Sequence, residues 1–161
     1  QLWLNNLKRV ILTWDMKRFK QFFAEKAVLG LIEFFDVDGI GKIPSKLDSG
    51  NGAFNVIHGE DIQIQGNKEH FKTVNNKRLM KDKVDDITIN VGAGHTEDRP
   101  VVNFDLKIGN KEYKDIPFSV GDRTTNLFKI LVSKDFIEKE LDALIDVSQE
   151  NIAHKEVEAE I

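Results

Sequence analysis

The chain has no cysteine, no apolar run long enough to span a membrane, and no overall excess of positive charge. Without cysteine it can form neither disulfides nor thiolate zinc sites, and it has no cysteine nucleophile; the absence agrees with a reducing compartment. A membrane helix needs about 20 consecutive apolar residues, and residues 1–15 carry Lys8, Arg9 and Asp15 within their apolar pattern. We therefore expect no membrane partner, no secretory signal and a cytoplasmic location.

The net charge of -4 gives no general reason to expect a nucleic-acid partner. The charge is unevenly spread, because residues 1–26 are basic and residues 134–161 are acidic. A basic arm could contact phosphates, but Lys and Arg also commonly occupy the wet face of an amphipathic helix. The charge pattern leaves both interpretations of the first 26 residues open.

The apolar pattern divides the chain into three parts. Residues 1–26 have apolar side chains at three- and four-residue spacing, which predicts an amphipathic helix. Residues 27–148 are rich in β-branched and aromatic residues and predict one β-rich domain. Residues 149–161 are polar and acidic, and we expect a frayed or disordered tail.

Apolar side chains alternate with polar ones along several segments of the middle part, as expected for half-buried strands. The alternating sets are Ile62 and Ile64; Ile87, Ile89 and Val91; Val102, Phe104, Leu106 and Ile108; and Ile116, Phe118 and Val120. Glycine and asparagine between them, at 65–68, 92–95 and 108–111, can adopt positive φ and favour hairpin turns. Residues 134–144 have helical spacing after Ser133, a potential cap, and predict a short C-terminal helix.

An aspartate in a tight turn stands between two apolar segments, in the sequence Asp48-Ser49-Gly50. The turn and the order of elements after it resemble the retropepsins, and more closely the small bacterial retropepsin-like proteins named ATP-dependent zinc proteases. Lys46 to Ile57 follows the pattern K-I-D-T-G-A-x-T-S-x-[LI] of that family. Residues 97–137 resemble its succession of R-P-V, strand, apolar strand, D-R, L-L-G-R and helix, and the match ends at "LIDVS", residues 144–148.

The resemblance implies a mainly β fold, a closed acid-protease barrel with a short C-terminal helix, and aspartic endopeptidase activity on a peptide or protein substrate. Two adjacent carboxylates share one proton and activate a water against the peptide carbonyl. One such aspartate per chain implies a homodimer in which two copies of Asp48 meet. Ser49 would bond across the pair and Gly50 would donate to the carboxylates, while Asn51, Gly52 and Ala53 would contact the substrate. From the residues alone, Asp48 could equally be an Asx-type turn residue.

Three departures from the family pattern bear on activity. Asn51 replaces an alanine, and Ser133 with Lys134 replaces Gly-Arg, so we expect crowding beneath the turn. Retropepsin order places the flap between about Val74 and Asp86, a segment that contains no glycine. A protein that keeps the fold without a working site is therefore the alternative.

Other chemistry finds little support in the sequence. The histidines lack H-x-x-x-H spacing, and only His58 has acids close by, at Glu60 and Asp61, so we expect no metal and no cofactor. The acids and glycines of residues 36–39 indicate a turn, because the ligand series of a calcium loop is incomplete. Ser49 lacks the G-x-S-x-G elbow of an esterase.

A second resemblance lies near the start of the chain. Residues 16–27, "MKRFKQFFAEKA", resemble the capsid-targeting leader of internal head proteins of large tailed bacteriophages, which ends at a cleavable A-E. The resemblance implies a phage protein found in the host cytoplasm or the phage head, with cleavage after Glu25. An ordinary amphipathic helix packed on the barrel explains the same residues. The alternative function is accordingly a non-catalytic phage structural or internal head protein.

Overall fold

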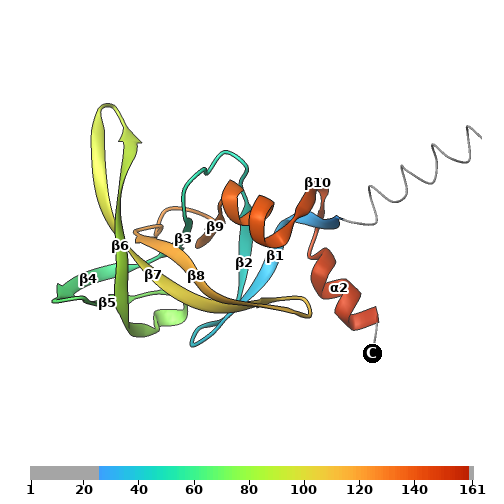
Figure 1. Cartoon of the computed structure of the whole chain (residues 1–161), viewed down its shortest axis with the longest axis horizontal. Coiled ribbons are helices and arrows are strands. Elements are labelled where there is room, and N and C mark those ends of the chain that lie inside the picture. Colours follow the sequence, from blue (N-terminus) through green and yellow to red (C-terminus); the bar gives the residue numbers. More distant parts are fainter. Residues whose placement is uncertain (1–25, 160–161) are drawn as a thin grey trace, which may run out of the picture.

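The computed structural model describes residues 26–159 and confirms a mainly β chain with a short C-terminal helix (Figure 1). Its strands are β1 (Ala27–Val37), β2 (Gly41–Leu47), β3 (Asn55–His58), β4 (Glu60–Gln65), β5 (Lys68–Lys72), β6 (Arg78–Gly92), β7 (His95–Ile108), β8 (Lys111–Gly121), β9 (Ile130–Val132) and β10 (Ala143–Glu150). Three short helical segments accompany them: η1 (Val74–Asn76), the π-helical η2 (Phe136–Leu141) and α2 (Ile152–Ala159). The N-terminal helix and leader predicted for residues 1–26 lie almost wholly outside the described residues.

All ten strands belong to one sheet, in the order β10-β1-β2-β9-β3-β8-β7-β6-β5-β4. The sheet curls, so that β1 also pairs with β7 through Asp36 with Lys107 and Val37 with Leu106. This pairing joins β1, β2, β9, β3, β8 and β7 into a ring, while β10 lies outside β1 and the β4–β5 hairpin outside β6. No helix among residues 26–159 is long and apolar enough to cross a membrane.

The core fills the inside of the ring. The alternation predicted for β7 and β8 is present, because Val102, Phe104, Phe118 and Val120 are at most 1% exposed. Phe104 and Phe118 meet edge to face, with ring centroids 5.5 Å apart. Apolar side chains at every second position of two long strands thus supply the centre of the domain.

The predicted hairpin turns are confirmed at all three places. Each connects two antiparallel neighbours: β4 with β5, β6 with β7, and β7 with β8. Gly66, Gly94 and Gly109 take φ values of 63°, 76° and 58° in these turns. Residues with a side chain, apart from Asn and Asp, rarely adopt positive φ. The glycines therefore permit the chain reversals.

The C-terminal region differs from its prediction. The helix expected at residues 134–144 begins at Lys134 as predicted and includes η2 (Phe136–Leu141), but it ends early, at Asp142 in the left-handed region with φ 44°. The following residues form β10, parallel to β1, so the boundary predicted at residue 148 falls within a strand. The tail expected from residue 149 contains the end of β10 and then α2 (Ile152–Ala159).

Buried Glu33 fixes α2 to the sheet. Its carboxylate accepts the backbone N–H groups of Gly30 at 2.8 Å, Ile152 at 3.0 Å and Ala153 at 3.3 Å. The last two belong to the first turn of α2, where N–H groups have no partner within the helix. A carboxylate on β1 therefore caps the helix.

The segment expected to form a flap is not a free hairpin. Residues 74–76 form η1, and residues 78–82 of β6 pair with β5. Beyond residue 83, β6 pairs only with β7, and the two strands project from the sheet as a long hairpin that turns at Gly92, Ala93 and Gly94 (Figure 1). The projecting hairpin thus lies later in the chain than predicted, and its turn contains glycine.

Candidate functional site

The Asp48 turn, residues 48–51, is held by a strand from a distant part of the chain. β9 lies between β2 and β3, parallel to the first and antiparallel to the second. The chain leaves β2 at Leu47, passes through the turn, and returns along the other side of β9 as β3. Both ends of the loop are consequently fixed to the same strand.

Hydrogen bonds extend this frame into the turn. Asp48 N–H donates to Val132 O at 3.1 Å, and Lys134 N–H donates to Asn51 O at 2.7 Å. Within the turn, Asn51 N–H donates to Asp48 O at 3.1 Å. The turn is therefore bonded to residues 132–134 on both sides, and its backbone has little freedom.

The Asp48 side chain is half-buried and partly engaged. Gly50 N–H donates to Oδ1 at 2.9 Å, the N–H contact that the resemblance implies. Among residues 26–159 no donor contacts Oδ2, so one carboxylate oxygen is available to a water, a ligand or a second chain. Ser49 and Gly50 are exposed, as are Gly52 and Ala53.

The replacements expected to crowd the turn have other contacts. Ser133 is 2% exposed, and its Oγ accepts Phe136 N–H at 3.2 Å, at the start of η2. The side chain of Lys134 is exposed. The Asn51 side chain folds back on its own loop and donates from Nδ2 to Phe54 O at 3.2 Å. Ser133 and Asn51 thus bond to groups other than the Asp48 carboxylate.

Arg123 interacts electrostatically with Asp48, and Arg99 interacts in turn with Arg123. Burial lowers the pKa of Arg123, the positive charge of Arg99 lowers it further, and the negative charge of Asp48 partly offsets both. Arg99 forms an ion pair with Glu97, through Nε to Oε1 at 3.1 Å. Its guanidinium also lies against Gly121, where a β-carbon would stand 2.6 Å from Arg99 Nε. Gly121 thus provides the space that brings Arg99 to this end of β8.

The loop of residues 122–129 is fixed by His58 and Lys129. Arg123 N–H donates to His58 Nδ1 at 2.9 Å, so the imidazole proton is on Nε2, which lies 2.9 Å from Glu60 Oε1. Lys129 Nζ donates to the carbonyls of Arg123, Thr124 and Asn126 at 2.8, 3.0 and 2.9 Å. The ammonium group of Lys129 thus lies at the centre of the loop and holds three of its carbonyl groups together.

Glu60 is the acidic partner expected for His58, whereas Asp61 pairs with Arg78. Contacts from Lys72, then His58, lower the pKa of Glu60. Residues 26–159 contain no group of three potential metal ligands. The role of His58 in this structure is to hold the loop that carries Arg123, through the bond from Arg123 N–H to Nδ1. The residues next to His58 in the sequence could not reveal this contact.

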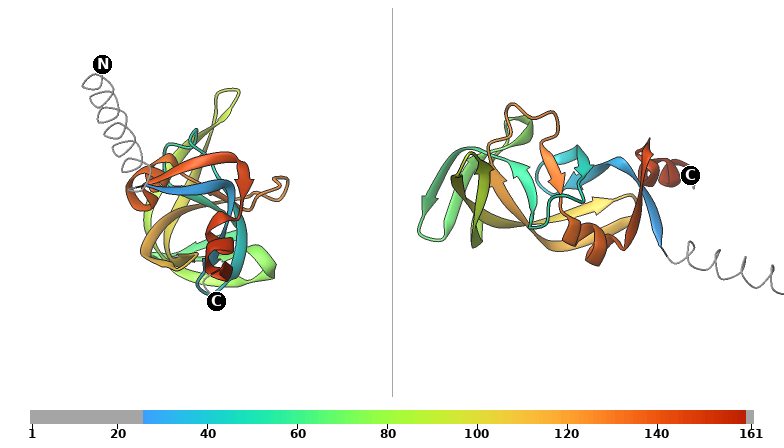
Figure 2. Two further views of the ribbon diagram at one scale, coloured as in Figure 1. Left: turned by 90° about the vertical axis from the view of Figure 1, so that its right-hand side faces the viewer. Right: turned by 90° about the horizontal axis from the view of Figure 1, so that it is seen from above.

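The β6–β7 hairpin stands on the same side of the domain as the Asp48 turn (Figure 1, and the left view of Figure 2). Ile87 pairs with Arg99 and Ile89 with Glu97, so these four side chains share one face of the hairpin. Because Arg99 lies against Gly121, this face is turned toward the loop that borders Asp48. The opposite face carries polar residues such as Thr88 and Asp98, which bond to each other at 2.5 Å.

The comparisons with known proteins identify a fold and no activity. No protein-family model matches the chain, and no curated protein matches it. The crystal structure of a protein of unknown function (DUF785) from Legionella pneumophila subsp. pneumophila str. Philadelphia 1 is similar, with a TM-score of 0.65 and 21% sequence identity. The match covers 79% of this chain and 98% of the Legionella protein. At this identity the likeness concerns the fold alone.

Proposed function

We propose that the chain is a retropepsin-like aspartic endopeptidase, in which two copies place their Asp48 carboxylates side by side. The observation that supports this most is the state of the Asp48 side chain. One of its oxygens is fixed by Gly50 N–H, and the other has no donor within the described residues. A carboxylate held in this way on a rigid turn is suited to share a proton with a second carboxylate and to orient a water.

The surroundings of the turn are compatible with a site for an extended peptide. On this proposal the β6–β7 hairpin is the flap, and the ring of strands is the acid-protease barrel. The hairpin's Ile87 and Ile89 would cover apolar side chains of a peptide, while the glycines at its tip would let it bend. Asn51, Gly52 and Ala53, which follow the turn, would line the other side of that peptide.

One observation favours the alternative, a non-catalytic phage structural or internal head protein on the same fold. Arg123 interacts electrostatically with Asp48 and brings positive charge close to its carboxylate. Positive charge stabilises ionised carboxylates and opposes the sharing of one proton between them. An aspartate beside a half-buried arginine can serve as a structural turn residue, as the alternative requires.

The test is a digest of a peptide library with the wild type and with Asp48→Asn, read by mass spectrometry from acidic to neutral pH. An amide cannot share the proton or activate the water, so the variant should retain its fold and lose all cleavage. The matched control is Asp146→Asn, because Asp146 makes the same type of turn contact, from Ser148 N–H to Oδ1 at 3.0 Å. This control should cleave as the wild type does.

Sedimentation of the wild type at tens of micromolar supplies the second readout. The proposal requires a dimer, since one chain holds half of the site. Equal cleavage by wild type and Asp48→Asn would indicate a contaminant. A strict monomer that cleaves nothing would contradict the peptidase and leave the structural alternative.

A further inference from the structure

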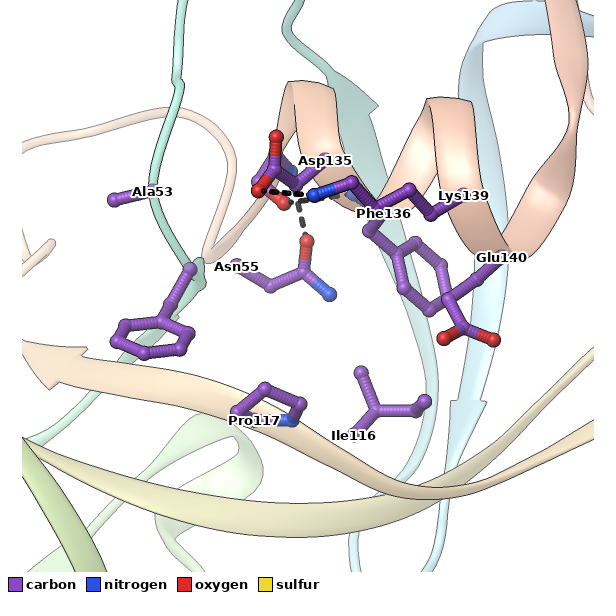
Figure 3. A pocket seen from close by; sticks show the side chains of 10 residues that line it. Ala53, Asn55, Ile116, Pro117, Asp135, Phe136, Lys139 and Glu140 are labelled. Atoms are coloured by element: carbon purple, nitrogen blue, oxygen red, sulfur yellow. Dashed lines mark hydrogen bonds and ion pairs between the residues drawn. The ribbon is translucent and has the colours of Figure 1, made fainter.

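A hollow of about 200 Å³ lies between the start of β3, β8 and η2 (Figure 3). Its walls are mainly apolar and come from Phe54, Ile116, Pro117 and Phe136. These residues belong to separate parts of the chain, which the sheet brings together beside the loop that follows the Asp48 turn. The hollow is a feature of the folded domain, since no single segment could form it.

One polar side chain, Asn55, lies in the wall of this hollow. Asn55 is 1% exposed, and its Oδ1 accepts Ser133 N–H at 2.7 Å. Because a backbone N–H can only donate, this bond fixes which end of the amide carries the oxygen. Nδ2 has no hydrogen-bond partner among residues 26–159, and it points into the space in front of Ile116 and Pro117 (Figure 3). A buried donor without a partner is unfavourable, and a ligand acceptor would relieve this.

The size and charge of the hollow restrict the ligand. A cavity of roughly 150 Å³ accommodates benzene, so this one has room for a ring and a small carbonyl group. At the rim Lys139 is paired with Asp135 at 3.2 Å, and Glu140 adds a second acid. A rim without net positive charge does not attract anions, and the one donor in the wall requires an acceptor.

We propose that this hollow binds a small neutral compound with an aromatic or branched apolar body and one carbonyl group, which accepts a hydrogen bond from Asn55 Nδ2. The hollow adjoins the proposed substrate site, because Ala53 belongs to both, but binding in it does not depend on catalysis. Asn55 holds Ser133, whose neighbours Val132 and Lys134 hold the Asp48 turn. A bound compound would therefore contact the frame that supports this turn.

Acetophenone, with benzene as the ring that lacks the acceptor, tests the proposal. Each is titrated into the ¹⁵N-labelled full chain and followed by NMR. We expect acetophenone to bind with a millimolar Kd, as small fragments do, and to shift the side-chain NH₂ resonances of Asn55. Benzene should bind several-fold more weakly and leave those resonances nearly unchanged.

Asn55→Asp tests the hydrogen-bond donor without changing the shape of the cavity. It keeps the acceptor for Ser133 N–H and removes Nδ2. It should weaken acetophenone at least about fivefold and leave benzene unaffected. The control Asn90→Asp changes an exposed amide that also accepts a backbone N–H, from Gly92 at 3.0 Å, and should bind as the wild type does.

Glu140→Trp tests the cavity independently, should Asn55→Asp fold poorly. A tryptophan at this exposed rim position should cover the hollow and abolish the binding of both compounds. The proposal is overturned if neither compound binds the wild type at concentrations up to about 10-fold the expected millimolar Kd, or up to the solubility limit of the compound. It is also overturned if the shifts lie elsewhere or if Glu140→Trp binds acetophenone normally.

Discussion

Glu69 on β5 should make the domain less stable as the pH rises toward neutrality. The residue is 0% exposed, and neither carboxylate oxygen has a hydrogen-bond partner among the described residues. Burial raises its pKa to about 7, the negative charge of Asp86 adds to the rise, and the positive charge of Lys83 opposes it. The folded protein therefore favours the protonated form of a side chain that ionises near pH 4.5 when unfolded.

The sign and size of the effect follow from this difference. Below about pH 4.5 the side chain is neutral in both states and its burial carries no charge penalty. Between about pH 4.5 and 7 the Glu69 side chain has lost its proton in the unfolded state but keeps it in the folded state. The free energy of unfolding therefore falls as the pH rises to about 7. A shift from 4.5 to about 7 corresponds to about 3 kcal/mol, at 1.36 kcal/mol per pKa unit.

Glu69→Gln removes the charge and keeps the shape. The variant should match the wild type near pH 4.5 and exceed its free energy of unfolding by up to about 3 kcal/mol at pH 8, or on the order of 10 °C in Tm. Urea denaturation from pH 4.5 to 8.5 measures this. Glu112→Gln, at an exposed position of β8, is the control and should follow the wild type at every pH. If Glu69→Gln also follows the wild type, the buried carboxylate is solvated and the argument fails.

Two further contacts give predictions of their own. Glu33→Ala should lower the free energy of unfolding by about 2 kcal/mol or more and speed amide exchange in α2, because three N–H groups lose their acceptor. Glu33→Gln should have an effect between those of the wild type and Glu33→Ala. Unchanged exchange in α2 would contradict the capping role. Lys129→Met should cost about 1–3 kcal/mol and speed exchange in residues 122–128, since three carbonyls lose a charged donor. Lys129→Arg should not restore the loop, because a planar guanidinium cannot converge on three carbonyls as an ammonium does; full rescue by arginine would refute that geometry.

Much of the sheet could be predicted from local patterns. The hairpins around Gly66, Gly94 and Gly109 combine period-two alternation with turn residues, and both signals are contained in a short window. β10 gave no such signal. Its first four residues are half-buried and its last four exposed, so neither face alternates, and its pairing with β1 depends on residues over 100 positions away.

The candidate site was predictable only in part. Asp48, Ser49 and Gly50 are contiguous and form a recognisable turn in any context. Arg99, Arg123 and His58 are not contiguous with it, and they come to this region through the pairing of β3 with β8 and of β8 with β7. The segment expected to form a flap pairs with β5 instead, because the β4–β5 hairpin precedes β6, and the hairpin that projects from the sheet comes later in the chain.

The position of β9 also determines when the Asp48 turn can take shape during synthesis. The bond from Ser133 to Asn55 spans 78 residues, and β9, which lies between β2 and β3, is made after both of them and after β8. Until it emerges from the ribosome, β2 and β3 lack the neighbour that both share, and the turn between them has no frame. Contacts so distant in sequence are slow to form. A nascent or truncated chain that ends before residue 130 therefore carries Asp48 without its geometry, and this part of the molecule can be organised only after residues 130–134 have been made.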